Sequence, residues 1–253
     1  MSNVLEVAVE AARAAGEVAL KYYRGGFDVT VKPDRSPVTQ ADREAERVII
    51  DTLRAAFPGY GFLGEEFGAE GTPEIRWIVD PIDGTRNFVR HIPIWAVLIA
   101  LEERGEITAG VVLNPVTGDL HTARKGGGAF ANGERIRVSP ICELGDAFVV
   151  YSGLNLIRKC EQWEGFLRLV DGAYRARGFG DYFTYTVLAE GKAEIAVEVD
   201  VKPWDLAPLK ILVEEAGGRF TDFAGKPTIY SGTALASNGI LHDTALAVLN
   251  RAR

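Results

Sequence analysis

The segment from Trp77 to Phe88, W-I-V-D-P-I-D-G-T-R-N-F, constrains the fold of this chain more than any other. It opens with an apolar, partly β-branched run, which predicts a short buried strand that ends at Asp80. Asp80 and Asp83 then share a turn that Pro81 stiffens. Two carboxylates that converge in a dry cleft repel each other and take up a proton unless a divalent cation neutralises them. The segment therefore predicts a buried strand with a metal site at its end.

The residues after the aspartates add a place for an anion. Gly84 and Thr85 offer backbone N–H groups at the expected first turn of a short helix, a geometry that accepts a phosphate. Metal-assisted phosphate chemistry is therefore one interpretation of the segment. The other is structural, because aspartates in D-x-x-D-G-T can form an Asx turn that caps a helix. The spacing alone leaves both interpretations open.

The whole string from Trp77 to Phe88 is more specific than its spacing, and it resembles the signature of the inositol monophosphatase superfamily. The resemblance extends over nearly all of the chain. It implies an α/β fold, a layered αβαβα sandwich of the sugar-phosphatase type. An α+β part over residues 1–140 and an α/β part over residues 141–253 would hold metal ions between them. The resemblance also implies a homodimer, which composition does not show.

Two more acids join the site through the resemblance. The first glutamate of G-E-E, here Glu65, ligates metal and polarises the attacking water in this superfamily; a solvated surface acid is the alternative. Asp205 lies in the second signature, W-D followed by a helix of small residues. The alternative for Asp205 is a first-turn carboxylate that the helix dipole favours. The implied catalytic and metal-binding set is Glu65, Asp80, the Ile82 carbonyl, Asp83, Asp205 and Thr85, which helps to orient the water.

This all-oxygen set suits Mg²⁺ rather than a softer metal. Two or three Mg²⁺ ions per site would offset the phosphate charge and lower the pKa of the attacking water. We expect Gly84 and Thr85 to contact the phosphate, and no phospho-enzyme, because no Cys or Ser nucleophile lies in an activated motif. The resemblance also implies accessory roles for Asp42 and for Lys32 on the preceding loop; a helix cap is the alternative for Asp42.

The second half of the chain narrows the choice of ester. Its runs G-F-G-D-Y-F and E-V-D-V-K-P-W-D are similar to those of the bacterial histidinol-phosphate phosphatases of this superfamily. Inositol-type relatives generally carry a small uncharged residue near Asp181, whereas a carboxylate there, together with Glu198, suits a cationic amine or imidazole. Histidinol carries both groups. A helix N-cap is the alternative for Asp181, and an exposed strand position is the alternative for Glu198.

The expected reaction is Mg²⁺-dependent hydrolysis of histidinol phosphate to histidinol, a step of histidine biosynthesis. A broad inositol-1-phosphate or fructose-1,6-bisphosphate phosphatase is the first alternative, because the central motif is shared. A catalytically silent, ligand-binding member of the fold is the second. Intact Glu65 and Thr85 argue against the silent form.

Composition limits the partners. The chain has 253 residues, 47% of them hydrophobic, enough for one large core or two closely packed subdomains. A net charge of −7 without a Lys/Arg run disfavours nucleic acid and anionic membrane surfaces. The N-terminus lacks a basic signal region and the apolar stretches are too short to span a membrane, which predicts a cytoplasmic protein. We expect reduced thiols at Cys142 and Cys160, and we assign no histidine to catalysis.

Periodicity predicts the order of the elements. Helices are expected over Val4–Tyr23 and from Thr39 to Phe57, separated by a strand and a loop. Residues from Trp95 to Val138 fit an antiparallel meander with a hairpin at Asn132-Gly133, and the R-K-G-G-G run within it fits scaffold rather than a phosphate loop. The C-terminal part is predicted to alternate strands and helices: Ala147–Tyr151, Leu154–Val170, Tyr174–Arg177, Asp181–Glu190, Glu194–Val199 and Pro203–Ala216.

Overall fold

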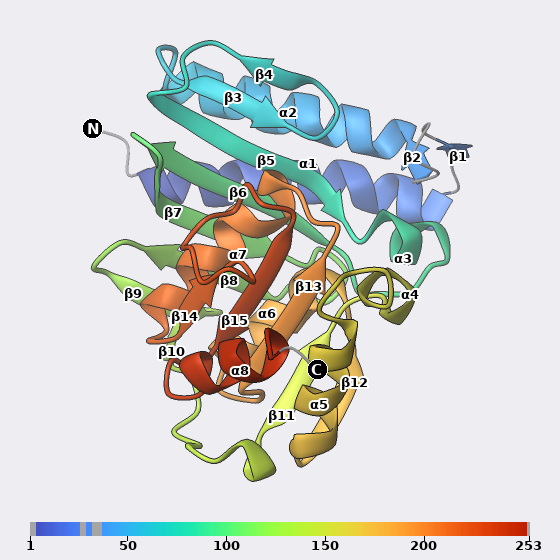
Figure 1. Cartoon of the computed structure of the whole chain (residues 1–253). Helices are drawn as coiled ribbons and strands as arrows, with labels where there is room; N and C mark the ends of the chain where they lie inside the picture. The colour runs from blue at the N-terminus through green and yellow to red at the C-terminus, as the bar shows by residue number, and fades with distance from the viewer. Residues whose placement is uncertain (1–3, 26–28, 32–36, 252–253) are drawn as a thin grey trace.

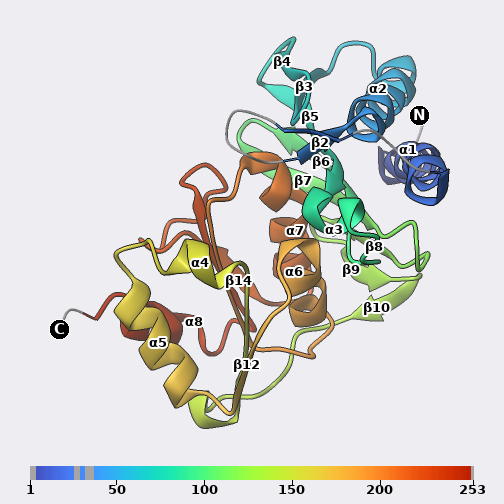
Figure 2. The ribbon, with the colours of Figure 1, turned by 90° about the vertical axis from the view of Figure 1, so that its right-hand side faces the viewer.

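The molecule is built from layers of helices and sheets. The computed structural model describes residues 4–25, 29–31 and 37–251, and only the backbone of residues 29–31 and 37–39. Within these ranges the layers run helix, sheet, helix, sheet, helix, with the two chain ends at opposite sides (Figure 1, Figure 2). The α/β class and the predicted αβαβα layering are confirmed.

The first sheet has eight strands in the order β10-β9-β8-β7-β6-β5-β3-β4 within the described residues. Its pairs are antiparallel except for β3 with β5, and β6 to β10 form the predicted meander. The strands are β3 (Gly61–Gly64), β4 (Gly68–Glu70), β5 (Ile75–Asp83), β6 (Ala96–Glu103), β7 (Glu106–Leu113), β8 (Leu120–Arg124), β9 (Gly128–Ala131) and β10 (Glu134–Ile136).

The expected hairpin joins β9 to β10. Asn132 and Gly133 both have positive φ, 51° and 86°, as a two-residue type I′ turn requires. The adjacent R-K-G-G-G run is scaffold, as predicted. Its Gly126 and Gly128 N–H groups, which could otherwise bind an anion, both donate to the Glu215 carboxylate at 2.8 Å.

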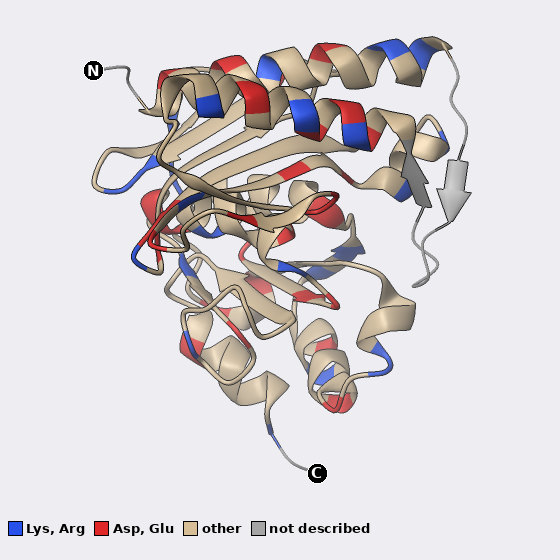
Figure 3. Ribbon diagram, turned by 90° about the horizontal axis from the view of Figure 1, so that it is seen from above, with Lys and Arg blue, Asp and Glu red and all other residues tan. Residues whose placement is uncertain are grey.

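Alternate residues of the central strands pack on opposite faces of the first sheet. Trp77 and Val79 of β5 face the outer helices α1 (Val4–Gly25) and α2 (Gln40–Ala56). Ile78 faces the inner helices α6 (Asp181–Ala189) and α7 (Pro203–Glu215) instead. This period of two is what a strand buried on both faces requires. Along α1 and α2, charged residues of both signs are interspersed (Figure 3).

The second sheet has the order β12-β11-β13-β15-β14 and lies on the other side of α6 and α7. Strand β11 is parallel to β12 and β13, whereas β15 is antiparallel to β13 and β14. A further core packs the outer helices on this sheet. These elements are β11 (Phe148–Tyr151), α4 (Leu154–Ile157), α5 (Trp163–Gly172), β12 (Arg175–Gly178), β13 (Ile195–Val199), β14 (Arg219–Thr221), β15 (Thr233–Ser237) and α8 (His242–Leu249).

Residues 1–140 supply the first sheet and residues 141–253 the second. Because α6 and α7 of the second part pack on the first sheet, one hydrophobic core is shared by both parts. The division near residue 140 stays a prediction. None of the helices in the described ranges has the length and apolarity needed to cross a bilayer.

Three expectations about the elements were wrong. Strand β5 does not end at Asp80; it continues to Asp83 through a bulge, because Pro81 has no N–H for the ladder. The single helix expected over Leu154–Val170 is split into α4 and α5 by the turn at residues 158–162. Part of the expected loop, Pro37–Thr39, forms strand β2 against β1 (Val29–Val31).

Candidate active site

A cavity of about 450 Å³ lies where the carboxyl ends of β5 and β13 meet the beginnings of α3 (Thr85–Val89), α6 and α7. Its wall is strongly acidic, and Arg86 is the one Lys or Arg among its described lining residues. Neither His nor Cys is among those residues. The acids that line it are Glu65, Asp80, Asp83, Asp181, Glu198, Asp200 and Asp205.

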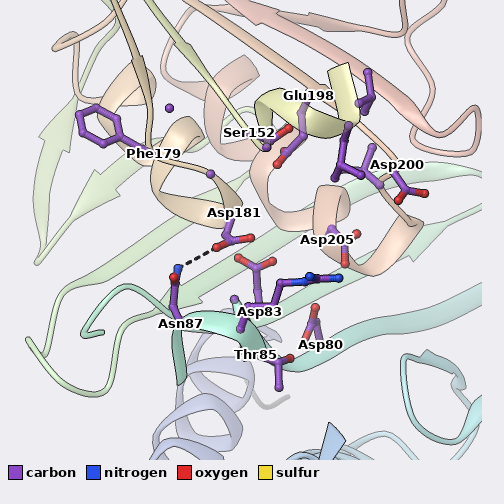
Figure 4. A pocket seen from close by; sticks show the side chains of 18 of the residues that line it. Asp80, Asp83, Thr85, Asn87, Ser152, Phe179, Asp181, Glu198, Asp200 and Asp205 are labelled. Carbon is purple, nitrogen blue, oxygen red and sulfur yellow. Dashed lines mark hydrogen bonds between the residues drawn. The ribbon is translucent and has the colours of Figure 1, made fainter. Parts of the chain in front are cut away.

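Three of these acids converge on one point. Asp80, Asp83 and Asp205 each offer a carboxylate oxygen, and these oxygens lie within 4.8 Å of one another. Figure 4 shows the three side chains pointing together from β5 and from the first turn of α7. The chain therefore brings acids from both of its parts to one place, as the sequence predicted for these residues.

Backbone N–H groups hold one oxygen of each carboxylate. Asp80 Oδ1 accepts the N–H of Ile82 at 2.9 Å, and Asp83 Oδ2 accepts the N–H of Tyr182 at 2.6 Å. Asp205 Oδ2 accepts the N–H of Lys202 at 2.7 Å. The first-turn interpretation of Asp205 is thus confirmed, and the same carboxylate also belongs to the cluster.

The cluster is electrostatically unfavourable unless a cation is bound. Burial, followed by the charges of Glu65 and Asp83, raises the pKa of Asp80 well above its usual value. Burial and then the charge of Asp181 do the same for the pKa of Asp83. Burial also raises the pKa of Asp205 to about 7. A buried all-oxygen set that holds excess negative charge fits a hard divalent cation, so these residues can hold a metal ion.

Glu65 follows β3 and lines the cavity. Of the charges near Asp80, that of Glu65 raises the pKa of Asp80 most. Glu65 is not one of the three residues whose oxygens form the tight cluster. Ile82 lines the cavity too, and its carbonyl accepts the Thr85 hydroxyl at 3.0 Å.

Gly84 precedes α3 with φ 86°, a conformation that favours glycine. A Cβ there would lie 3.0 Å from the Ile94 carbonyl oxygen and 3.2 Å from Asp181 Oδ2. The backbone at this position therefore lies against Asp181, and a side chain would crowd the cavity.

Asp181 and Glu198 line the end of the cavity that the metal cluster leaves free. Asp181 Oδ2 accepts the amide N–H of Asn87 at 2.9 Å (Figure 4). The N-cap interpretation of Asp181 is wrong: Gly180 is the N-cap, and Asp83 instead of Asp181 accepts the Tyr182 N–H. Burial raises the pKa of Asp181 to about 6, against the opposing charge of Arg86.

Glu198 is only 6% exposed, so the alternative interpretation, an exposed strand position, is wrong. Burial, and then the charge of Asp181, raises the pKa of Glu198 well above its usual value. The buried Tyr185 hydroxyl lies close enough to Glu198 to lower the pKa of Glu198, although the geometry is not that of a normal hydrogen bond. Sequence reasoning missed Tyr185 and Asn87 because each acts only through an acid distant in the sequence.

The accessory residues contribute less. Asp42 is buried in the first turn of α2 and is not among the residues lining the cavity. Lys32, with its loop neighbour Ser36, lies outside the described residues. The buried His242 contacts Thr221 and Ser237, and His121 contacts Glu190, so neither reaches the cavity.

Comparison with known proteins shows the family to which this chain belongs. The model of the inositol monophosphatase family matches residues 1–253. The chain is 45% identical over 234 residues to a Mycobacterium tuberculosis histidinol-phosphatase, covering 89% of this chain and 90% of the relative. It is 36% identical to a Mesorhizobium japonicum inositol-1-monophosphatase, covering 99% and 97%. The solved structure of the Bartonella henselae extragenic suppressor protein suhB superposes with a TM-score of 0.93 at 34% identity, covering 100% of both chains. The chain therefore belongs to the inositol monophosphatase family.

Proposed function

We propose that this phosphatase is a Mg²⁺-dependent phosphomonoesterase whose preferred substrate is histidinol phosphate, which it hydrolyses to histidinol. The observation that carries the choice of substrate is the second pair of acids. Asp181 and Glu198 line the same cavity as the metal cluster but do not belong to that cluster. Of the charges near Glu198, that of Asp181 raises the pKa of Glu198 most. A cationic group on the ester would neutralise this pair.

Two or three Mg²⁺ ions would be held by Asp80, Asp83, Asp205, Glu65 and the Ile82 carbonyl. When bound, Mg²⁺ neutralises phosphate charge and makes a bound water acidic enough to attack phosphorus. Glu65 would polarise the attacking water, and the Thr85 hydroxyl, which donates to the Ile82 carbonyl, would help to orient that water. The backbone N–H groups of Gly84 and Thr85 bind a phosphate oxygen.

The amine end of the cavity, which we define as Asp181 and Glu198, selects the leaving group. Burial raises the pKa of both acids, so their ionised forms are unfavourable without a cationic partner. An ammonium or imidazolium group would supply that partner and form charge-assisted hydrogen bonds with the two carboxylates. Asn87 keeps the Asp181 carboxylate aimed at this group.

Inositol-1-phosphate is the second candidate substrate. The inositol-1-monophosphatase relative matches almost the whole chain, and the hydroxyl groups of a polyol can donate to the same two acids. A neutral polyol does not offset their charge, so we expect it to be the weaker substrate.

A substrate panel tests the proposal. Phosphate release is measured with histidinol phosphate, inositol-1-phosphate and fructose-1,6-bisphosphate, each with Mg²⁺ and with EDTA. We expect kcat/KM for histidinol phosphate to exceed the others by about tenfold or more, since one charged hydrogen bond contributes about 1.5–3 kcal/mol. A preference for inositol-1-phosphate would support the second candidate. Hydrolysis of none of the three would indicate a silent, ligand-binding protein.

The same proposal includes a cytoplasmic enzyme of histidine biosynthesis that is a homodimer, as the family resemblance implies. Light scattering of the purified protein measures the dimer directly. A mass near 27.5 kDa, that of one chain, would contradict it.

A further inference from the structure

A buried carboxylate outside the cavity holds the turn that carries Glu65. Glu46 of α2 is 0% exposed. Its two oxygens accept successive backbone N–H groups after Glu65: Oε2 from Glu66 at 2.9 Å and Oε1 from Phe67 at 3.0 Å. One side chain thus satisfies both backbone donors of this turn.

The residue before Glu65 fits the same carboxylate. A Cβ at Gly64 would lie 1.9 Å from Glu46 Oε1, so the Glu46 carboxylate would have to move. Glu46 therefore packs against the backbone on both sides of Glu65. The G-E-E motif requires glycine here because the carboxylate fills the space of a side chain.

A second contact ties the turn to the metal cluster. The Glu65 N–H donates to the Val79 carbonyl at 3.3 Å, and Gly64 pairs with Val79 across the parallel strands β3 and β5. Val79 directly precedes Asp80. The backbone of Glu65 is thus fixed on one side to the strand of the metal cluster and on the other to α2.

We propose that Glu46 is a positioning residue for Glu65, so that the outer helix α2 sets the affinity of the metal ion that Glu65 would hold. The inference rests on the proposed function only in requiring that the site binds Mg²⁺. Glu46 suits this role because its two oxygens accept the N–H groups of the two residues that follow Glu65.

The direct test is Glu46→Gln. The amide keeps the shape of the side chain but offers a single acceptor, and its NH₂ group faces a backbone N–H. We expect electron paramagnetic resonance titrations to show that the affinity for one Mn²⁺ ion falls by about tenfold or more. This is the usual effect of removing a group that holds a metal ligand in place. The Mg²⁺ concentration for half-maximal phosphate release should rise accordingly, while KM for histidinol phosphate changes by less than about threefold.

The matched control is Glu44→Gln, the same substitution at an exposed position of the same helix. It should leave Mn²⁺ binding unchanged. If Glu46→Gln lowers thermal stability but binds Mn²⁺ as tightly as the wild type, Glu46 is merely structural and the inference is wrong.

Gly64→Ala provides a second variant in case Glu46→Gln does not fold. Its Cβ would displace the Glu46 carboxylate, so we expect the same weakening of one Mn²⁺ ion. Unchanged Mn²⁺ binding in this variant would also overturn the inference. A wild-type protein that binds no Mn²⁺ and releases no phosphate would instead refute the proposed function, a result distinct from either.

Discussion

The two ends of the cavity hold their acids in different ways. At the metal end, Asp80, Asp83 and Asp205 each accept a backbone N–H. At the amine end, Asp181 accepts from the Asn87 side chain. Glu198 faces both the Tyr185 hydroxyl and the Asp181 backbone N–H, and each of them lowers the pKa of Glu198. The N–H donors at the metal end belong to the β5 bulge and to the beginnings of α6 and α7, so the fold itself supplies them. The amine end depends in part on two side chains, Asn87 and Tyr185, that can change while the fold stays, so it is where specificity can change.

The largest effect is expected at the metal end, from Asp83→Asn. The amide oxygen can still accept the Tyr182 N–H, but a metal charge is lost. We predict that phosphate release falls by about a thousandfold or more for every ester, since this charge acts on the phosphate itself. Circular dichroism should show an intact fold. Full activity of this variant would refute the site assignment.

At the amine end, Asp181→Asn should discriminate between esters. Asn tolerates the positive φ of 52° at this position, so the backbone is expected to be retained. We predict a loss of about 10- to 100-fold in kcat/KM for histidinol phosphate, the size of one charged hydrogen bond, and a much smaller loss for inositol-1-phosphate. Equal losses for both esters would show that Asp181 belongs functionally to the metal end.

Metal removal gives a third, smaller effect with a defined sign. Burial raises the pKa of Asp205 to about 7 in the folded protein, against about 3.9 for an unfolded chain. The folded state therefore favours the proton: stability is full below about pH 4 and is lost as the pH rises through about 7. In EDTA, urea unfolding should show Asp205→Asn to be more stable than wild type at pH 7 by about 1–3 kcal/mol, but not at pH 4.

Saturating Mg²⁺ should reverse this order at pH 7, because the metal stabilises the ionised wild-type cluster and not the variant. If Asp205→Asn is no more stable than the wild type in EDTA at pH 7, Asp205 does not lie among like charges. Comparison within one pair of proteins removes the contribution of other groups that titrate in this range, such as buried His242, whose pKa burial lowers to about 4.

The smallest effect is expected far from both ends. Glu215→Gln removes one of the two acceptors that hold Gly126 and Gly128. We predict a loss of about 1 kcal/mol in the free energy of unfolding and a kcat/KM within about twofold of wild type. A tenfold loss of activity would mean that the glycine-rich loop takes part in the site.

The metal end was largely predictable because its motifs are local and because the family resemblance joined Asp205 to Asp80 and Asp83. The strand, the bulge residues Asp80 and Asp83, and the first turn of α7 are each short motifs. The apolar runs of the central strands and the turn residues between them predicted the sheet and its meander in the same way. The continuation of β5 past Pro81 was missed because a bulge tolerates proline where a regular ladder does not.

The remaining features depend on contacts between distant segments. Whether Asp181 caps its helix was decided by Asp83, and the orientation of Asp181 by Asn87, neither of which its own neighbourhood indicates. Glu46 did carry a local signal. It shares the buried face of α2 with Ala45 and Ile49, where an acid needs partners. The identity of those partners, two N–H groups of the G-E-E turn, required the structure.

Joint metal binding by the two parts of the chain can be measured most directly in crystals grown with Mn²⁺. We predict an anomalous difference peak at coordination distance, about 2.0–2.2 Å, from oxygens of Asp80, Asp83 and Asp205 together. A map without a peak there, or with Mn²⁺ bound only elsewhere, would contradict the shared metal site and the phosphatase mechanism built on it.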